Sequence, residues 1–365
     1  MKVLFITNLP SPYRVDFFNE LGKQADLTVC YERERSSERN ENWVNTAKRN
    51  YTETFIHARK LGTDKSIGFG IINALRQEQF DHVIITGYSS PSVMLGILYC
   101  QFAGIPYLME DDGGLYRGRE EKHRLLKALL LRKVKAYFTT TDENIQTLAD
   151  LGVPKDKILK YPFSSVKDGD IQDGMLKSQE KASIRNELGI GEKKIILTVG
   201  QFIHRKGFDL LLRAFAGFSQ ECGLYFVGGE PTKEYLQLVD ELHISNVHFI
   251  GFKSKEELKN YYAAADLFVL PTREDIWGLV INEAMAAGLP IITTNRCGAG
   301  LELIKNGENG FLVQVGDREA LREKMMLILN DSQRQKSMSQ KAFDVINGYS
   351  IEKMAAWHIQ ALEKL

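Results

Sequence analysis

The sequence predicts an α/β protein built from two Rossmann-like domains in tandem, which face a central cleft. Strand-like apolar runs alternate with helical patterns along most of the chain, as is typical of parallel strands joined by crossover helices. A polar stretch at 164–182 interrupts this alternation, which then starts again. The length of 365 residues also favours two domains over one. We therefore expect two sheets, with ligands bound near the carboxyl ends of their strands.

The first domain is predicted to cover residues 1–164. Its strands are expected at 2–7, 27–32, 82–86, 105–109, 136–141 and 157–162. Its helices are expected directly after Pro12, at 71–79 and at 124–134. The long apolar run 93–109 is broken by a glutamine, a glycine and a proline. This run is therefore interpreted as a buried helix followed by a strand rather than as a membrane span.

The second domain is predicted to cover 191–347, after a linker at 165–190 that lacks a continuous apolar face. Its strands are expected at 194–200, 224–229, 247–251, 267–271, 290–294 and 311–313. The tail at 348–365 has the pattern of one amphipathic helix. We assign this helix to the first domain, so that the chain crosses back at its end.

Composition excludes several classes of protein. Lysine and arginine together number 47, as do aspartate and glutamate, so the chain lacks the positive charge of a general nucleic-acid binder. The four cysteines are scattered without metal-ligand spacing, which indicates reduced thiols rather than disulfides or a metal site. The chain enters a strand at once, without the pattern of a secretory signal, so we expect a cytoplasmic protein.

The most informative stretch is 271–290, PTREDIWGLVINEAMAAGLP. It follows a buried strand, passes through a Trp-Gly-Leu turn and enters a helix, and a helix start of this kind binds anions. Asp275 and Glu283 lie eight residues apart around this turn. Carboxylates repel an anion, unless they bind neutral hydroxyls next to it. The expected ligand is therefore both anionic and hydroxyl-rich, and a nucleotide sugar is one such ligand.

A second turn, at 200–207, carries Arg205 and Lys206 just before the next helix. Cations oppose the helix dipole there, which indicates a bound anion, although two solvated loop cations would look the same. A third motif, Asp168-Gly169-Asp170, matches the D-x-D of metal-dependent sugar transferases. No strand precedes it, and it lies in the predicted linker. We expect neither a metal ion nor a cofactor.

These motifs together resemble the family-four retaining glycosyltransferases, which have the GT-B fold. The resemblance rests on the turn at 200–207, the Gly228-Gly229 turn, the FIG triplet at 249–251 and the stretch 274–290. GENGFLV at 307–313 and the closing helix also fit, so nearly the whole chain is covered. The opening Pro-Tyr-Arg and the EDDGG loop at 110–114 resemble a subgroup that builds bacterial capsules and exopolysaccharides.

The resemblance implies a role for each matching residue. Asp275 would hold hydroxyls of the transferred sugar, and Glu283 would hold the ribose hydroxyls. Lys206 and the amides near Gly278 and Leu279 would bind the diphosphate. Further donor contacts are expected from Gln201, Gly228 and Phe252, and acceptor contacts are expected from Tyr13 and Arg14.

The sequence departs from the family pattern at three positions. Asp275 replaces the usual glutamate, which shortens its reach, and Glu274 is the second choice for its role. Gln201 replaces an arginine, whose charge Arg205 would supply. Asp112 stands where many members have histidine, so it would orient an acceptor or sugar hydroxyl. Alternatively, Asp112 forms an Asx turn with the two glycines that follow it.

The segment Arg117–Lys135 is strongly basic, with leucines between its charges. One expectation is that this segment contacts a membrane surface or an acceptor with a lipid diphosphate. The alternative is a helix whose leucines pack inward and whose charged face is solvated.

The function that follows is transfer of a sugar from a nucleoside-diphosphate sugar, with a UDP-sugar favoured, to a hydroxyl of a glycan or lipid-linked glycan. The anomeric configuration would be retained, the pathway would be surface polysaccharide synthesis, and the place would be the cytoplasm or the inner face of the membrane. A nucleotide-sugar epimerase and a non-catalytic transferase subunit are the alternatives.

Overall fold

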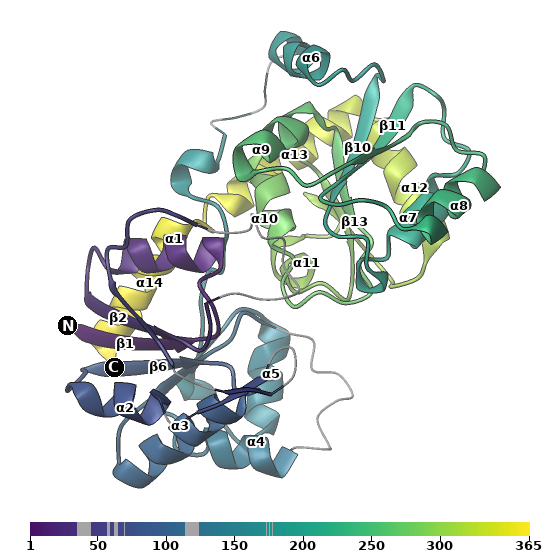
Figure 1. Ribbon diagram of the computed structural model, residues 1–365. Coiled ribbons are helices and arrows are strands. Elements are labelled where there is room, and N and C mark those ends of the chain that lie inside the picture. The colour runs from purple at the N-terminus through teal and green to yellow at the C-terminus, as the bar shows by residue number, and fades with distance from the viewer. Residues whose placement is uncertain are drawn as a thin grey trace. The chain divides into compact units, whose positions relative to one another are not determined.

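The computed structural model describes residues 1–34, 45–56, 59–61, 65–68, 70–113, 124–172, 174, 176 and 178–365. The chain forms two compact units (Figure 1). Unit 1 consists of Met1–Ser164 together with Ser350–Leu365, and unit 2 consists of Ser165–Tyr349. Within the described residues, no helix is long and apolar enough to cross a membrane.

Unit 1 is built on a parallel sheet with the order β3-β2-β1-β6-β7-β8-β9. The strands are β1 (Lys2–Thr7), β2 (Asp26–Tyr31), β3 (Thr52–Phe55), β6 (His82–Thr86), β7 (Leu108–Glu110), β8 (Tyr137–Thr139) and β9 (Ile158–Lys160). A separate antiparallel pair is formed by β4 (Arg59–Leu61) and β5 (Lys65–Ile67). The strand order reverses between β1 and β6, which is where ligands bind in sheets of this kind.

Helices cover the sheet of unit 1. They are α1 (Pro12–Leu21), α2 (Gly70–Gln77), α3 (Pro91–Ala103), α4 (Arg124–Leu131), α5 (Asp142–Asp150), the 3₁₀ helix η2 (Lys155–Lys157) and the C-terminal α14 (Ile351–Lys364). Figure 1 shows α14, the last helix of the chain, alongside α1, the first, and the two are in contact. The closing helix therefore belongs to unit 1, and its buried face includes Met354, His358 and Leu362.

Unit 2 has a second parallel sheet with the order β12-β11-β10-β13-β14-β15. The strands are β10 (Lys194–Val199), β11 (Cys222–Val227), β12 (Val247–Ile250), β13 (Leu267–Leu270), β14 (Ile291–Thr294) and β15 (Gly310–Val313). Every residue of β11, β13 and β14 is buried. Strands that are covered on both faces need such continuous apolar runs, which is why the sequence predicts them directly.

The helices of unit 2 complete the fold. They are η3 (Asp168–Asp170), α6 (Ser178–Glu187), η4 (His204–Lys206), α7 (Phe208–Phe215), α8 (Lys233–Glu241), α9 (Lys255–Ala264), α10 (Leu279–Ala286), α11 (Gly298–Leu303), α12 (Arg318–Leu329) and α13 (Ser332–Ile346). The segment 165–190, expected to be a linker, lies within unit 2. Lys181 and Arg185 of α6 both form ion pairs with Asp266, which precedes β13, and so attach the helix to the sheet.

Candidate active site

Two turns that lie about seventy positions apart in the sequence meet at the carboxyl edge of the unit 2 sheet. The turn 200–207 follows β10 and the turn 271–278 follows β13, and these two strands are neighbours. The strand order reverses between them, because β11 and β12 lie on one side of β10 and β13 to β15 on the other. The reversal point is the expected ligand site of a parallel sheet. The two sequence motifs therefore form one site.

Backbone contacts hold the two turns together. Gly207 has a φ of 68°, and a Cβ at this position would lie 2.2 Å from the carbonyl oxygen of Pro271. Only glycine allows this close approach. The amide of Arg273 donates to the carbonyl of Arg205 at 2.8 Å, and Thr272 Oγ1 donates to the same oxygen at 2.9 Å. The backbone of Arg205 is thus fixed against the second turn.

The charged centre of the site consists of Lys206, Arg205 and Asp275. Lys206 Nζ lies 2.6 Å from Asp275 Oδ2, and Arg205 Nη1 lies 3.1 Å from Asp275 Oδ1. The side chains of Lys206 and Asp275 are only 13% and 11% exposed, whereas that of Arg205 is 44% exposed. Arg205 also donates to the main-chain carbonyl of Glu274 at 2.8 Å. Asp275, the first choice for the sugar-binding carboxylate, is therefore the one in contact with both cations.

The helix α10 begins directly beside this centre. Its N-cap is Gly278, which has a φ of 95°, and a Cβ there would lie 2.7 Å from Cys297 Sγ. Because the N-cap is a glycine, the cap residue has no side chain that could accept hydrogen bonds from the first amides of the helix, which start at Leu279. Free amides and the positive end of the helix dipole attract an anion. Lys206 and the α10 start can therefore act on the same negatively charged group.

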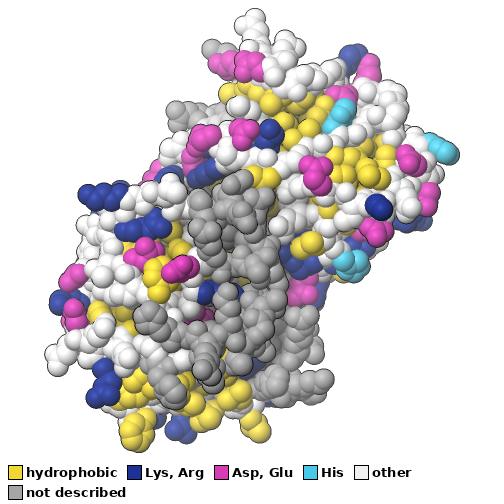
Figure 2. All heavy atoms as spheres, viewed as in Figure 1, with side chains coloured by type: hydrophobic (Ala, Val, Ile, Leu, Met, Phe, Trp, Pro, Cys, Tyr) yellow, Lys and Arg dark blue, Asp and Glu magenta, His cyan; other side chains and the backbone are white. Residues whose placement is uncertain are grey.

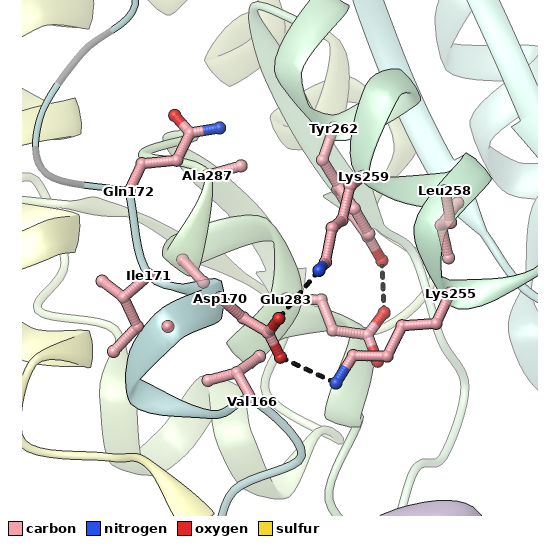
Figure 3. A pocket seen from close by; sticks show the side chains of 12 residues that line it. Val166, Asp170, Ile171, Gln172, Lys255, Leu258, Lys259, Tyr262, Glu283 and Ala287 are labelled. Carbon is pink, nitrogen blue, oxygen red and sulfur yellow. Dashed lines mark hydrogen bonds and ion pairs between the residues drawn. The ribbon is translucent and has the colours of Figure 1, made fainter. Parts of the chain in front are cut away.

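Glu283 lies one turn further along α10. Its carboxylate accepts a hydrogen bond from Tyr262 Oη at 2.9 Å and a longer one from Ser165 Oγ at 3.4 Å. Burial raises the pKa of Glu283, although the hydrogen bond from Tyr262 lowers it in part. Glu283 and Tyr262 line a cavity of about 230 Å³ in unit 2 (Figure 3). The carboxylate predicted to bind ribose therefore faces a space that can hold a ligand.

The same cavity contains part of the D-x-D motif. Figure 3 shows Asp170 between Lys255 and Lys259 of α9, at 2.7 and 2.8 Å from their ammonium groups. Burial alone would raise the pKa of Asp170, but the hydrogen bonds from the two lysines outweigh it and set the pKa at about 2. Asp170 of the motif thus forms ion pairs within the protein. Among the described residues, no group of three or more His, Cys, Asp or Glu is arranged to hold a metal ion.

The remaining predicted donor contacts lie at the ends of neighbouring strands. Gln201, which follows β10, is exposed, and Phe252, which follows β12, is 39% exposed. Gly228, after β11, has a φ of 125°, and a Cβ there would lie 3.0 Å from the carbonyl oxygen of Gly200. All three positions therefore lie at the same edge of the unit 2 sheet as Lys206.

The predicted acceptor residues come together in unit 1. Asp112 accepts hydrogen bonds from Tyr13 Oη, at 2.9 Å, and from Arg14 Nη2. Arg14 itself is only 3% exposed and also pairs with Glu110 at 2.6 Å. Its guanidinium is therefore held inside unit 1, which leaves Asp112, with a side chain 29% exposed, as the more accessible group.

The Asx turn considered for Asp112 would involve the amide of Gly114, which lies outside the described residues, whereas the neighbouring Asp111 does form such a turn. Asp111 Oδ1 accepts a hydrogen bond from the amide of Gly113 at 3.1 Å, and Asp111 also accepts from Tyr137 Oη and Thr139 Oγ1. Burial raises the pKa of Asp111 to about 6. The two aspartates alternate in direction after β7, so that Asp111 points into unit 1 while Asp112 faces Tyr13. Gly114 and residues 117–123 lie outside the described residues.

Several residues of these clusters were not predicted from the sequence. Glu110, at the end of β7, and His358, on α14, are both fully buried and in contact at 2.8 Å. The available signal was a histidine on the apolar side of the closing helix, four residues after Met354. Tyr262 and the partners of Asp170 have no comparable sequence signal, because they approach only in the folded unit.

Comparison with known proteins finds similar sugar transferases. Residues 180–345 match the family described as glycosyl transferases group 1. A relative 32% identical over 169 residues, which are 45% of this chain and 44% of the relative, is the N-acetyl-alpha-D-glucosaminyl L-malate synthase of Bacillus anthracis. Another, from Campylobacter jejuni, is 23% identical over 286 residues, 75% of this chain and 74% of the relative. It is an N,N'-diacetylbacillosaminyl-diphospho-undecaprenol alpha-1,3-N-acetylgalactosaminyltransferase.

For four of the curated relatives that it matches, the chain spans about half of the relative's length, between 44% and 53%. Among solved structures, Anabaena HepE in complex with UDP has a TM-score of 0.81 at 16% identity, and the similarity covers 100% of both chains. The predicted fold class, two Rossmann-like units of the GT-B type, is therefore confirmed.

Proposed function

We propose that the protein transfers a sugar from a nucleoside-diphosphate sugar to a hydroxyl group, because residues 180–345 match the family described as glycosyl transferases group 1. The donor is proposed to be a UDP-sugar. The observation that carries the proposal is the charged centre of Lys206, Arg205 and Asp275 beside the uncapped start of α10. This arrangement provides both cations for a diphosphate and a carboxylate for neighbouring hydroxyls.

In the proposed reaction, negative charge builds up on the diphosphate as its bond to the sugar breaks. Lys206 and the first amides of α10 stabilise this charge, because they are fixed before the reaction by the contacts around Gly207 and Gly278. In the structure, Lys206 and Arg205 are both paired with the Asp275 carboxylate. The diphosphate of the donor therefore competes with Asp275 for these two cations. Asp275 is then released to accept hydrogen bonds from sugar hydroxyls, and Glu283 accepts those of the ribose.

The acceptor is proposed to be a glycan or a lipid-linked glycan of a surface polysaccharide, bound at Tyr13 and Asp112 of unit 1. Retention of the anomeric configuration and independence from metal ions are part of the proposal. The relatives support this class of acceptor, since one of them transfers a sugar to an undecaprenol-linked substrate. The anomeric proton of the product, read by NMR against that of the donor, tests the retention.

A membrane contact is proposed for one surface of unit 1. Phe102 of α3 is 92% exposed and Leu125 of α4 is 88% exposed, and Leu98 and Leu129 are also exposed. Figure 2 shows hydrophobic side chains together with lysine and arginine side chains at the lower end of the view, where α3 and α4 lie in Figure 1. Apolar side chains flanked by cations fit an anionic membrane surface, here the inner face of the cytoplasmic membrane.

A turnover assay tests the proposed function. The purified chain is incubated with UDP-sugars and GDP-sugars, with and without a lipid-linked glycan, and free nucleoside diphosphate is measured. Release that depends on the acceptor supports transfer. Isomerised sugar without net transfer would indicate an epimerase, and no turnover with any donor would indicate a non-catalytic subunit.

A further inference from the structure

A chain of buried charges connects the C-terminal helix of unit 1 to Asp112. His358 of α14 contacts Glu110, Glu110 pairs with Arg14, and Arg14 pairs with Asp112. His358 and Glu110 are fully buried, and Arg14 is nearly so. Charged groups in such a setting remain ionised only if they are paired and hydrogen-bonded. The protonation of each member therefore depends on its neighbours.

Both ring nitrogens of His358 face oxygen atoms. Nδ1 lies 2.7 Å from the carbonyl oxygen of Met354, which can only accept a hydrogen bond. Nε2 lies 2.8 Å from Glu110 Oε2. Burial favours the neutral form of Glu110, but the guanidinium of Arg14, 2.6 Å from its Oε1, favours the ionised form and lowers the pKa of this carboxyl. An ionised Glu110 also only accepts, so both nitrogens of His358 must donate and the ring must carry two protons.

The groups around His358 agree with a charged ring. The aromatic rings of Phe17 on α1, Phe138 on β8 and Tyr161 after β9 surround it, with centroids 4.8, 5.5 and 5.1 Å away. The ionised partners from the packed elements are Glu110 of β7 and, beyond it, Arg14 of α1 and Asp112. With His358 charged, the row of four side chains, His358, Glu110, Arg14 and Asp112, contains two cations and two carboxylates and so has no net charge.

Glu110 divides its two oxygens between the two cations. Oε2 accepts from His358 and Oε1 accepts from Arg14 at 2.6 Å. The remaining guanidinium nitrogen, Nη2, is directed to Asp112. Because Arg14 is planar and its donors are fixed relative to one another, the orientation of Glu110 determines where Asp112 is held. Asp112 lies near the point of strand-order reversal in unit 1.

We propose that His358 holds both ring protons and, through Glu110 and Arg14, acts as the positioning residue for Asp112 at the carboxyl edge of the unit 1 sheet. The C-terminal helix is then part of the acceptor site rather than only a cover of the fold. The effect on acceptor kinetics rests on the proposed function. The protonation of His358 and its link to Arg14 are independent of the proposed function.

The first test measures protonation on the unmodified, full-length chain labelled with ¹⁵N in histidine and arginine. The two ring nitrogens of His358, assigned by the loss of their signals in His358→Gln, are both expected to show the chemical shifts of protonated nitrogens at neutral pH. A ring with one unprotonated nitrogen at neutral pH would overturn the proposal.

The second test follows the link to Asp112. In His358→Gln, the side-chain Nε–H resonance of Arg14 is expected to shift, and kcat/KM for the acceptor is expected to fall about tenfold or more, because the carboxylate is misplaced. Donor affinity, measured by calorimetry, is expected to stay unchanged. The matched control is His248→Gln, since His248 also pairs with a glutamate, Glu192, but in unit 2.

The outcomes separate the two proposals. An Arg14 resonance that does not move in folded His358→Gln contradicts the link, as does equal loss of donor affinity and acceptor kinetics. An unmodified chain that never turns over a donor contradicts the proposed function, while the two NMR measurements still decide the protonation and the link.

Discussion

At the scale of single residues, two roles are assigned to Asp275, one in the structure and one in the proposed reaction. It neutralises Lys206 and Arg205 in the structure, and it is proposed to bind the sugar once diphosphate takes its place. An aspartate has a shorter reach than a glutamate would have at this position. The sugar would therefore lie closer to the cations, so this position is expected to influence which sugar is transferred.

Lys206→Ala is expected to lower turnover by about 10²-fold or more, because the leaving diphosphate loses a fixed cation. Steady-state kinetics with saturating acceptor provides the measurement. Lys233→Ala, which removes an exposed lysine at the start of α8, is the control and should leave turnover unchanged. Near-normal turnover of Lys206→Ala would mean that Lys206 serves only in the ion pair with Asp275 and does not act on the leaving group.

Glu283 predicts a pH dependence of donor binding. Burial raises its pKa, so it takes up a proton at a higher pH than an ordinary glutamate does. The ionised form accepts hydrogen bonds from ribose hydroxyls, and the protonated form does so poorly. Donor affinity is therefore expected to fall as the pH decreases through this raised pKa, and Glu283→Gln should be weaker throughout and lose the dependence. Calorimetry over a pH series checks this, and parallel curves for both proteins would contradict it.

At the scale of elements, the close approach of the turn 200–207 to the turn 271–278 depends on one glycine. Gly207→Ala is expected to destabilise unit 2, because it places a Cβ 2.2 Å from the carbonyl oxygen of Pro271. Gly189→Ala is a matched control, since Gly189 has the same φ of 68° but has nothing within 4 Å of its Cβ position. Both variants share the cost of the left-handed backbone, about 1 kcal/mol. Gly207→Ala should cost at least about 1 kcal/mol more.

Denaturant unfolding of the two glycine variants gives this difference directly, and donor affinity should fall only in Gly207→Ala. Equal stability of the two variants would mean that the close approach of the turns is not needed.

The surface formed by α3 and α4 predicts membrane binding. Replacing both Phe102 and Leu125 by glutamine is expected to reduce binding to vesicles with anionic lipids. Burial of each apolar side chain in the membrane contributes about 1.5–3 kcal/mol to binding, and the variant loses this contribution. Sedimentation with vesicles at low salt measures it. The control is Leu236→Gln, which changes an exposed leucine of α8 in unit 2. Undiminished binding of the double variant would contradict the membrane contact.

Elements differ in how far the sequence predicts them, and the reason is burial. The strand β13 is a run of four buried apolar residues and is predicted directly. The strand β3 was missed, because Thr52–Phe55 lies at the sheet edge and is not fully buried. The helix α6 was expected to be part of a linker, because it has no buried residue and hence no apolar face. Ion pairs with Asp266, which a single sequence does not reveal, hold it in unit 2.

At the scale of the whole molecule, the site residues that could be predicted from the sequence are those that lie in local sequence motifs. The turn at Lys206 and the stretch from Asp275 to Glu283 each combine a strand end, a glycine and a helix start. Such combinations can be recognised from the sequence alone. The row from His358 to Asp112 joins residues about 250 positions apart and depends on the chain returning to unit 1. No local pattern contains that information.

Lys206 and the start of α10 are together proposed to bind the diphosphate of the donor. Calorimetry with UDP and with uridine, on the unmodified chain and on Lys206→Ala, tests it most directly. A hydrogen bond to a charged group is worth about 1.5–3 kcal/mol, so Lys206→Ala should weaken UDP binding about tenfold or more. The affinity for uridine, which has no phosphate, should not change. Equal UDP affinity in both proteins, or an equal loss for UDP and uridine, would contradict the claim.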